Sequence, residues 1–302
     1  MKIIDKIIST AKRLIDLPYN CFSLENYDKV LYRNNLEFNY IETDENKPIK
    51  LMSNNHNNAG IISIDYHKAI HHKKRIFIVG KGILFDSGGL NLKYKMGGMQ
   101  GDKAGMIVAL SVANYLKGNV MAYCPITTNF IQTSKITPCD IIKIGNKRVR
   151  VNNTDAEGRL ILAEAISTLN VSKNDTIITI ATLTGAVGYA IDEKATGVFG
   201  INDKLINLYL EASKEVKEYA WRLPLFDYMQ DFYKKQPFKN AEDKIKAGAS
   251  EGAMFIKQFV PHPENWFHLD CASSSFDKNG RANGVPLLSL IKFIKKLNES
   301  KI

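Results

Sequence analysis

Short apolar runs alternate with helical patterns along this chain, and that alternation limits the fold more than any other feature. Runs suited to buried strands cover 75–80, 120–130 and 175–183. Helical patterns at 103–116 and 160–169 separate them. Strands that alternate with helices form a sheet with helices on both faces. The sequence therefore predicts the α/β class, with a single domain built on one mixed, mostly parallel central sheet.

The other elements follow from the same kind of pattern. Apolar side chains at helical spacing predict a helix over 2–17, which Pro18 ends. This helix is expected to pack on its own domain, with a membrane-surface anchor as the alternative. The further elements expected are a strand near residue 41, a loop to Gly60, a strand over 61–66, a hairpin over 140–152 that turns at Gly145-Asn146, a helix over 205–220, a stop at 221–225, a helix from about Glu251 and a helix over 284–297.

Two segments rich in glycine and carboxylates carry the chemistry of the chain. The first is VGKGILFDSGGLNLKYKMGGMQGDK at 79–103, and the second is NNTDAEGRL at 152–160. A tight loop or a helix cap would account for either segment taken alone. Together they hold the carboxylates Asp86, Asp102, Asp155 and Glu157 and the cations Lys81, Lys93 and Arg159.

Four carboxylates gathered in a partly dry site would repel one another and tend to keep their protons. Two divalent cations would balance their charge, and oxygen ligands suit Zn, Mn, Co or Mg. Lys81 could join such a site as a neutral amine, because burial lowers the pKa of a lysine. The segments therefore predict a two-metal hydrolase, in which the cations generate the hydroxide nucleophile and polarise a carbonyl.

The exact strings resemble one family. NTDAEGRL at 153–160, with VGKGILFDSGG upstream, is similar to the leucyl aminopeptidases, the cytosolic two-metal aminopeptidases also called family M17. Further matches follow in order: MQGDKAG at 99–105, ATLTGA at 181–186, WRLPL at 221–225 and WFHLD at 266–270. The resemblance covers nearly the whole chain. It implies that residues 1–302 form the catalytic domain, without the additional N-terminal domain that members usually carry.

The resemblance also implies a set of metal ligands. Asp86 matches the carboxylate that bridges both metals. Asp155 and Glu157 match the other ligands of one metal, and Lys81 and Asp102 match the remaining ligands of the second. All five positions hold the expected residue type.

Two catalytic roles and a substrate pocket are implied in the same way. Lys93 would stabilise the oxyanion, and Arg159 would anchor the bicarbonate that serves this family as general base. The backbone amide of Leu183 matches a further oxyanion contact. The residues expected to contact the substrate are Met99, Asn153, Thr182, Leu183 and Ala272.

The activity implied is removal of an N-terminal leucine, or another apolar residue, from peptides by a cytoplasmic homohexamer. Two departures from the family pattern bear on specificity. The loop between Lys93 and Asp102 is about two residues shorter than expected, and the polar run CASSS at 271–275 replaces a more apolar one. The alternatives are a dipeptidase of the Cys-Gly type and a non-catalytic, metal-containing assembly or nucleic-acid-binding protein.

Composition argues against a membrane protein and against a nucleic-acid-binding protein. Hydrophobic residues make up 45% and charged residues 24%, which is ordinary for a globular chain, and no apolar run reaches the ~18 residues of a membrane span. The net charge of +10 would attract nucleic acid, but the lysines are spread in ones and twos, so no such partner is expected. A cytoplasmic location is the default expectation.

The cysteines and histidines give no strong indication of a disulfide or of a further metal site. Cys21, Cys124, Cys139 and Cys271 lack CxxC spacing and are expected to be reduced core thiols. Four of the six histidines lie at 56, 67, 71 and 72. A metal site from His67 and His71 is the less favoured reading beside exposed loop positions.

Overall fold

The computed structural model describes residues 2–53, 57–66, 74–131 and 135–300. The α-helices are α1 Lys2–Asp16, α2 Tyr27–Tyr32, α3 Pro48–Met52, α4 Ala104–Leu116, α5 Glu157–Ser167, α6 Ala186–Ile191, α7 Asp203–Glu215, α8 Gly248–Lys257 and α9 Leu287–Glu299. The strands are β1 Asn39–Ile41, β2 Gly60–Ile64, β3 Ile76–Gly80, β4 Gly82–Asp86, β5 Val120–Asn129, β6 Ile141–Ile144, β7 Lys147–Arg150, β8 Thr176–Ala181, β9 Thr196–Gly200, β10 Ala220–Arg222, β11 Phe238–Lys239 and β12 Trp266–Asp270. Short 3-10 helices cover η1 Tyr19–Cys21, η3 Met99–Lys103, η4 Asp227–Tyr233 and η5 Pro263–Asn265.

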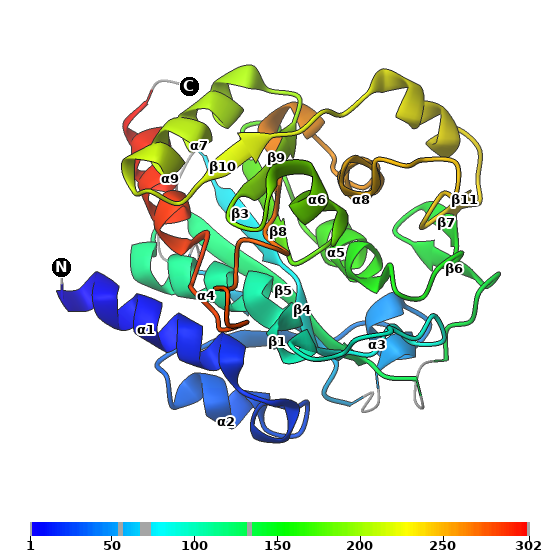
Figure 1. Ribbon diagram of the computed structural model, residues 1–302, viewed down its shortest axis with the longest axis horizontal. Coiled ribbons are helices and arrows are strands. Elements are labelled where there is room, and N and C mark those ends of the chain that lie inside the picture. Colours follow the sequence, from blue (N-terminus) through cyan, green and yellow to red (C-terminus); the bar gives the residue numbers. More distant parts are fainter. Residues whose placement is uncertain (1, 54–56, 67–73, 132–134, 301–302) are drawn as a thin grey trace.

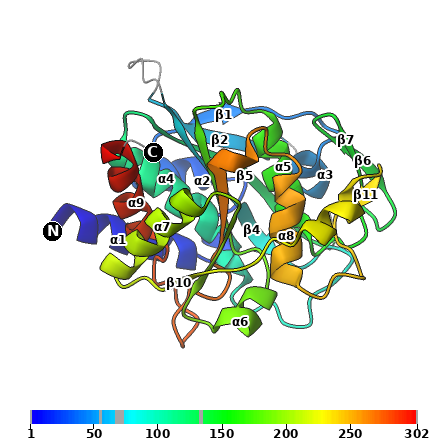
Figure 2. The same cartoon turned by 90° about the horizontal axis from the view of Figure 1, so that it is seen from above.

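A nine-stranded sheet forms the centre of the molecule. Its strands run in the order β1-β2-β5-β3-β8-β12-β9-β10, and β4 pairs with β5. The pairs of β3 with β5 and β8, β8 with β12, β9 with β10 and β4 with β5 are parallel, whereas β1-β2, β2-β5 and β9-β12 are antiparallel. Helices α1, α4, α7 and α9 lie on one side of this sheet, and α5 and α8 lie on the other (Figures 1 and 2). The predicted mixed, mostly parallel sheet with two helical layers is confirmed.

The sheet is covered on both faces, so its central strands are apolar throughout. Strands β3, β8 and β12 are buried at every residue, as parallel strands between two helical layers must be. Helix α4 is buried from Ala104 to Ala113 because it lies between the sheet and helices α1 and α9. A Cβ on Gly105 would lie 2.3 Å from the Ile180 carbonyl oxygen, so glycine is needed where α4 meets the sheet. That close approach fixes the segment just before α4, which carries Asp102.

The hairpin predicted over 140–152 is confirmed. Strands β6 and β7 pair in antiparallel fashion around Gly145, whose φ of +55° suits glycine. They form a separate three-stranded sheet with β11. The hairpin leads directly into 152–157, so a small peripheral sheet delivers the second carboxylate segment to the edge of the large one.

Several boundaries differ from prediction. Helix α5 begins at Glu157 rather than 160, α8 begins at Gly248, and α3 occupies part of the predicted loop. The stop expected at 221–225 begins instead as the edge strand β10, and α7 ends at Glu215. Strand β10 is three residues long and mostly exposed, so its sequence does not alternate between apolar and polar residues as a half-buried strand would. Its parallel pairing with β9 holds it in the sheet.

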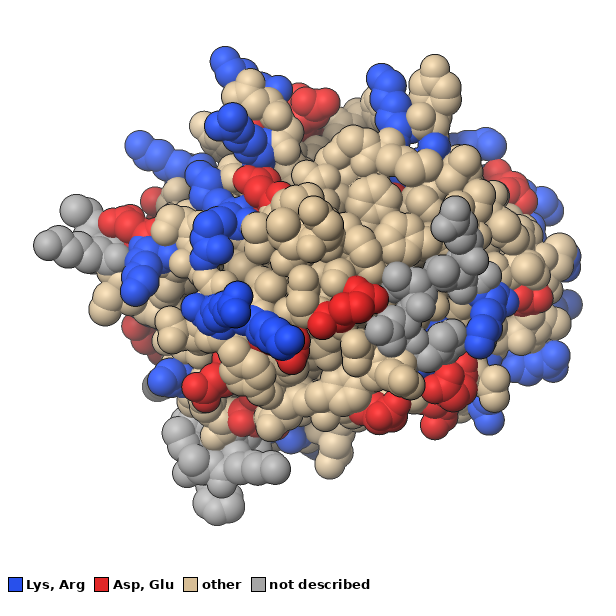
Figure 3. Space-filling model, turned by 90° about the horizontal axis from the view of Figure 1, so that it is seen from below, with Lys and Arg blue, Asp and Glu red and all other residues tan. Residues whose placement is uncertain are grey.

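The first helix packs on the domain, as expected. Ala11, Leu14 and Ile15 are fully buried against the core. No helix among the described ranges is long and apolar enough to cross a membrane. On the face in Figure 3, Lys and Arg lie in separate groups with Asp and Glu between them.

The cysteine prediction holds in part. All four thiols are free, and Cys124 and Cys271 are buried, but Cys21 and Cys139 are exposed and therefore are not core residues. Burial of the two core thiols raises the pKa of each to about 12. The histidines at 56, 67, 71 and 72 lie outside the described residues, so the metal site considered for His67 and His71 stays a prediction from the sequence.

Candidate active site

The site lies where several strands of the large sheet end. Asp86 ends β4, Asn129 ends β5, Asp270 ends β12 and Thr182 directly follows β8. Lys81 connects β3 to β4. The crevice beyond the carboxyl ends of parallel strands is the usual ligand site of open α/β sheets.

Lys81 lies buried between two carboxylates. Its Nζ is 2.8 Å from Oδ2 of Asp102 and 2.9 Å from Oε1 of Glu157. Asp102 comes from η3, and Glu157 is the first residue of α5. A Cβ on Gly158 would lie 2.7 Å from the Lys81 Nζ, so the absence of a side chain there lets the lysine reach Glu157.

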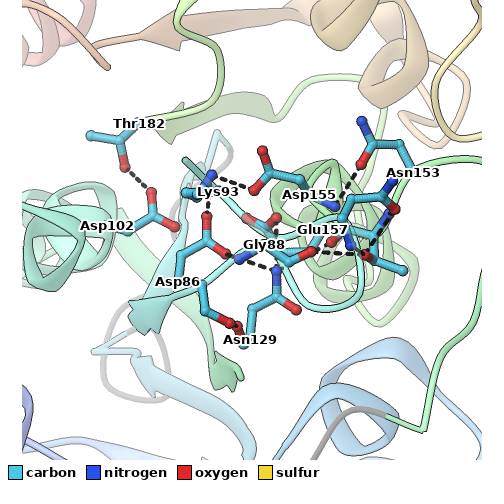
Figure 4. Close-up of polar contacts among 12 residues, drawn as sticks. Asp86, Gly88, Lys93, Asp102, Asn129, Asn153, Asp155, Glu157 and Thr182 are labelled. Atoms are coloured by element: carbon cyan, nitrogen blue, oxygen red, sulfur yellow. Dashed lines mark hydrogen bonds and ion pairs between the residues drawn. The ribbon is translucent and has the colours of Figure 1, made fainter. Parts of the chain in front are cut away.

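Lys93 makes a second, more open bridge. Its Nζ lies 2.7 Å from Oδ2 of Asp86 and also contacts Oδ1 of Asp155 (Figure 4). The backbone N–H of Gly88, at a φ of +89°, donates to Oδ1 of Asp86 at 2.8 Å. A residue with a side chain would strain that turn, so the glycine allows the turn to hold the Asp86 carboxylate in place.

Asn129 links the two carboxylate segments. Its Nδ2 donates to Oδ1 of Asp86 at 2.8 Å and to Oε2 of Glu157 at 3.2 Å (Figure 4). It also lies 3.2 Å from the carbonyl of Thr154. Thr182 holds the remaining carboxylate, because its hydroxyl donates to Oδ1 of Asp102 at 2.6 Å. The end of β5 and the residue after β8 therefore supply the side chains that orient these acids.

Burial and mutual repulsion set the charges in this cluster. Burial, with the charge of Asp86 next, raises the pKa of Glu157 to about 8. Burial also raises the pKa of Asp102 to about 6, against the opposing charge of Lys81. For Lys81, burial by itself lowers the pKa, but the charges of Asp102 and Glu157 outweigh it and raise the pKa. Without a metal, these carboxylates favour the charged form of Lys81, so its expected role as a neutral ligand beside a metal stays a prediction.

The donor set fits divalent cations. Asp86, Asp155 and Glu157 each offer an oxygen within 4.8 Å of the others. Oδ2 of Asp102 and Oδ1 of Asp155 are buried and accept no hydrogen bond among the described residues, although each contacts a lysine ammonium. Oxygens that meet only cations in a buried cluster are suited to hard metal ions. A cation bound to these carboxylates would remove the bias that keeps Lys81 protonated.

A pocket of about 200 Å³ opens onto the cluster. Met99, Thr182, Leu183 and Ala272, which the sequence assigns to the substrate, all line it. Phe276 also lines it and borders an adjoining cavity of about 950 Å³. The smaller pocket lies below the roughly 300–1,000 Å³ typical of sites for whole small ligands, so it suits one amino-acid side chain at a time.

One buried carboxylate, Asp270, fastens the loop after β8. Its Oδ1 accepts the N–H of Leu183 at 3.1 Å, and its Oδ2 accepts the hydroxyl of Thr184 at 2.7 Å. Burial raises the pKa of Asp270 to about 6 although these hydrogen bonds oppose the shift. The Leu183 N–H expected to contact an oxyanion is thus donated to Asp270, and its oxyanion role stays a prediction.

Arg159 and Asn153 are not among the described residues that line the pocket. Nη1 of Arg159 donates to the carbonyl of Asn240 at 2.7 Å and lies 3.2 Å from Oε2 of Glu251. Oδ1 of Asn153 accepts the N–H of Asp155 at 2.8 Å. Both residues lie behind the pocket, where they support the segment that carries Asp155.

The surroundings of Arg159 test the expected bicarbonate. Nε of Arg159 is buried without a hydrogen-bond partner among the described residues, so one donor is available. The positive charge, however, is already paired with Glu251. A further anion would have to bind a guanidinium whose charge is neutralised, so the residues present do not fit the ion.

Comparison with known proteins agrees with this geometry. The model of the cytosol aminopeptidase family, catalytic domain, matches residues 34–291. The chain belongs to this family. The cytosol aminopeptidase of Dictyostelium discoideum is 39% identical over 244 residues, which is 74% of this chain and 46% of that protein. The human cytosol aminopeptidase is 35% identical over 246 residues, with the same coverage of 74% and 46%.

A bacterial relative gives the same result. The probable cytosol aminopeptidase of Chloroherpeton thalassium is 38% identical over 221 residues, or 70% of this chain and 43% of that protein. The chain spans about half the length of these curated relatives. Membership of the cytosol aminopeptidase family is therefore established for the catalytic domain.

Sequence reasoning missed four side chains of this site. Asn129, Asp270, Glu251 and Phe276 contact the cluster, its loops or its pocket. Asn129 had a signal, since it is a polar residue at the end of an apolar strand beside the strand of Asp86. Glu251 had none, because a glutamate near a helix start is ordinarily a capping or surface residue.

Proposed function

We propose that the chain is a metal-dependent aminopeptidase that hydrolyses the N-terminal residue, leucine or another apolar one, from peptides. The observation that carries this proposal is the convergence of Asp86, Asp155 and Glu157 on one pocket, with Lys93 beside them. Family membership points to the same activity. The chain covers about half the length of these relatives, so its own residues are the basis of the proposal.

Two divalent cations, Zn, Mn, Co or Mg, would be held by the acids described above. Asp86, Asp155 and Glu157 would bind one of them, and Lys81 and Asp102 would complete the second site around the shared Asp86. When bound, the cations would polarise the scissile carbonyl and supply hydroxide at neutral pH.

Side chains of this protein would stabilise the oxyanion, recognise the free α-amine and bind the first side chain of the peptide. Lys93, whose Nζ lies at the open side of the cluster, would donate to the oxygen that becomes negative during attack. Asp102 would accept a hydrogen bond from the free α-amine and thereby select the N-terminus of a peptide. Met99 and Ala272 would line the pocket for the first side chain. The polar residues that follow Ala272 predict tolerance of residues other than leucine.

The experiment is hydrolysis of leucine p-nitroanilide by the purified protein after chelation, and again after Mn, Zn, Co or Mg is added back. Glu157→Ala removes a carboxylate of the cluster. Glu164→Gln is the matched control, because Glu164 is another buried acid of α5 but accepts the N–H of Ile49 away from the pocket. Activity should return with metal in the wild type and in the control, and should be absent in Glu157→Ala.

Other outcomes separate the alternatives. Hydrolysis of Cys-Gly and other dipeptides but not of longer peptides would indicate the dipeptidase. A folded, metal-loaded protein that is silent on every substrate would refute the proposal and favour the non-catalytic assembly, which salt-sensitive nucleic-acid binding would then identify.

We further propose a cytoplasmic homohexamer, which rests on the resemblance alone. Size-exclusion chromatography with light scattering would test the assembly. A monomer with full activity would contradict it.

A further inference from the structure

Arg159 and Glu251 form a buried ion pair behind the pocket. The two side chains are 7% and 8% exposed, and Nη1 of Arg159 lies 3.2 Å from Oε2 of Glu251. Oε1 of Glu251 accepts the backbone N–H of Glu242. Both carboxylate oxygens are therefore engaged, and the carboxylate is fixed in place against the guanidinium.

The pair is continuous with the walls of the site. A Cβ on Gly252, the residue after Glu251, would lie 2.9 Å from Cδ2 of Leu183 and 3.3 Å from Nη2 of Arg159. Helix α8 thus presses its backbone against both the guanidinium and the loop that lines the pocket. A shift of Arg159 would be transmitted to Leu183 and to α5, the helix that starts with Glu157.

Asn240 extends this connection to the metal-ligand segment. Its carbonyl accepts from Arg159 at 2.7 Å, and its Oδ1 accepts the N–H groups of Asn152 at 2.7 Å and Asn153 at 3.1 Å. Its Nδ2 donates to the carbonyl of Asn153 at 2.7 Å. The position of the guanidinium therefore bears on the turn that carries Asp155.

The other acid nearby does not compete for Arg159. Glu242 lies 3.3 Å from Nζ of Lys239, so its charge is met at the surface. The neighbouring Tyr233 hydroxyl is buried and makes no hydrogen bond among the described residues. A buried guanidinium needs one anion to balance it, and Glu251 is the carboxylate placed to do so.

We propose that Glu251 is the built-in counter-anion of Arg159, a positioning residue that takes the place expected for bicarbonate and makes the reaction independent of any external anion. The inference rests on the proposed peptidase activity. The free Nε can donate one hydrogen bond, but an added anion would meet a neutral pair rather than a lone cation. Removal of Glu251 leaves an unpaired buried cation, which a small carboxyl anion can then neutralise.

The test compares metal-loaded wild type, Glu251→Ala and Glu251→Gln in CO2-free buffer, with and without added bicarbonate or formate. Wild-type kcat should change less than about 2-fold with either anion. Each variant should lose kcat by at least ~10-fold and regain most of it with the anion, while KM changes little. Glu251→Asp should remain anion-independent.

Binding gives a readout apart from activity. Titration of ¹³C-bicarbonate, followed by NMR, should show saturable binding to Glu251→Gln and none to the wild type. Glu251→Gln keeps the shape of the side chain, so it carries the test if Glu251→Ala does not fold.

Three results would overturn the inference: a wild type that loses activity without bicarbonate, folded variants as active as wild type without any anion, or folded inactive variants that no anion rescues. A wild type inactive with every metal would refute the proposed function instead. The binding titration would then still decide, because bicarbonate bound by the wild type would refute the built-in counter-anion.

Discussion

Two clusters of acidic and basic side chains lie at the site, and they differ in their balance of charge and in their access to the pocket. At the pocket, Lys81 and Lys93 bridge carboxylates that also fit divalent cations. Behind the pocket, Arg159 is paired with Glu251 and donates to the carbonyl of Asn240. Neither Arg159 nor Glu251 is among the described residues that line the pocket. The first cluster has more carboxylates than cations and lines a pocket, whereas the second is a balanced, buried pair.

The difference comes from the balance of charge and from access. Four acids meet two lysines at the pocket, so the cluster keeps excess negative charge and burial raises the pKa values of Glu157 and Asp102. One acid meets one guanidinium behind it. Excess charge beside a pocket recruits a ligand, while a balanced buried pair supports structure and orientation.

The largest effect on this comparison is expected from Lys93→Ala. Loss of a donor to a developing oxyanion should reduce kcat by roughly 10²–10³-fold, while elemental analysis finds the same metal content. Lys95→Ala, an exposed lysine of the same loop, is the matched control and should keep the wild-type rate. A near wild-type rate in Lys93→Ala would show that the lysine has no role in turnover.

Asn129→Ala should weaken metal binding, because the amide orients both Asp86 and Glu157. Partners of metal ligands are typically worth about 10–100-fold in affinity, and competition with a fluorescent chelator would measure the change. Asn114→Ala, at the far end of α4, is the control. Equal affinities in the two variants would mean that the acids are positioned without the amide.

Metal binding should stabilise the chain more at pH 8 than at pH 5. Glu157 and Asp102, with pKa values raised to about 8 and about 6, favour the metal-free fold when protonated, and this stability is lost as pH rises through those values. Protons and cations compete for the same oxygens, so the gain in Tm on adding metal should grow across this window by several degrees, at roughly 2–4 °C per kcal/mol.

Calorimetry with and without metal would measure this gain. Burial raises the pKa of Glu164 to about 8 as well, away from the pocket, so Glu164→Gln removes one contribution to the pH dependence that has nothing to do with metal. A gain in Tm that stays constant from pH 5 to pH 8 in that variant would contradict the competition.

The smallest effect is expected behind the pocket. The Tyr233 hydroxyl is buried and unpaired among the described residues, so Tyr233→Phe removes a desolvated polar atom. We expect an unchanged kcat and a Tm equal to or slightly above that of the wild type. A clear drop in either would reveal that the hydroxyl takes part in holding the Arg159–Glu251 pair.

Much of the site could be predicted from the chain because its two carboxylate segments resemble the strings of one family, and that resemblance assigns each acid by position. Lys81, Asp86, Asp102, Asp155 and Glu157 converge as predicted. Glu251 could not be found this way, since it lies 92 positions from Arg159 (251 − 159) and only the packing of α8 on α5 joins them.

The sequence by itself determined the alternation of strands and helices, the strands that lead to the carboxylates and the identity of the acids, because burial patterns and ligand chemistry are local properties. The tertiary structure alone decided which strand lies beside which, how β10 extends the sheet, and which anion faces Arg159. Those outcomes depend on contacts between segments far apart in the chain, and the charge state of Lys81 depends on them too, since three carboxylates from three elements act on one buried amine.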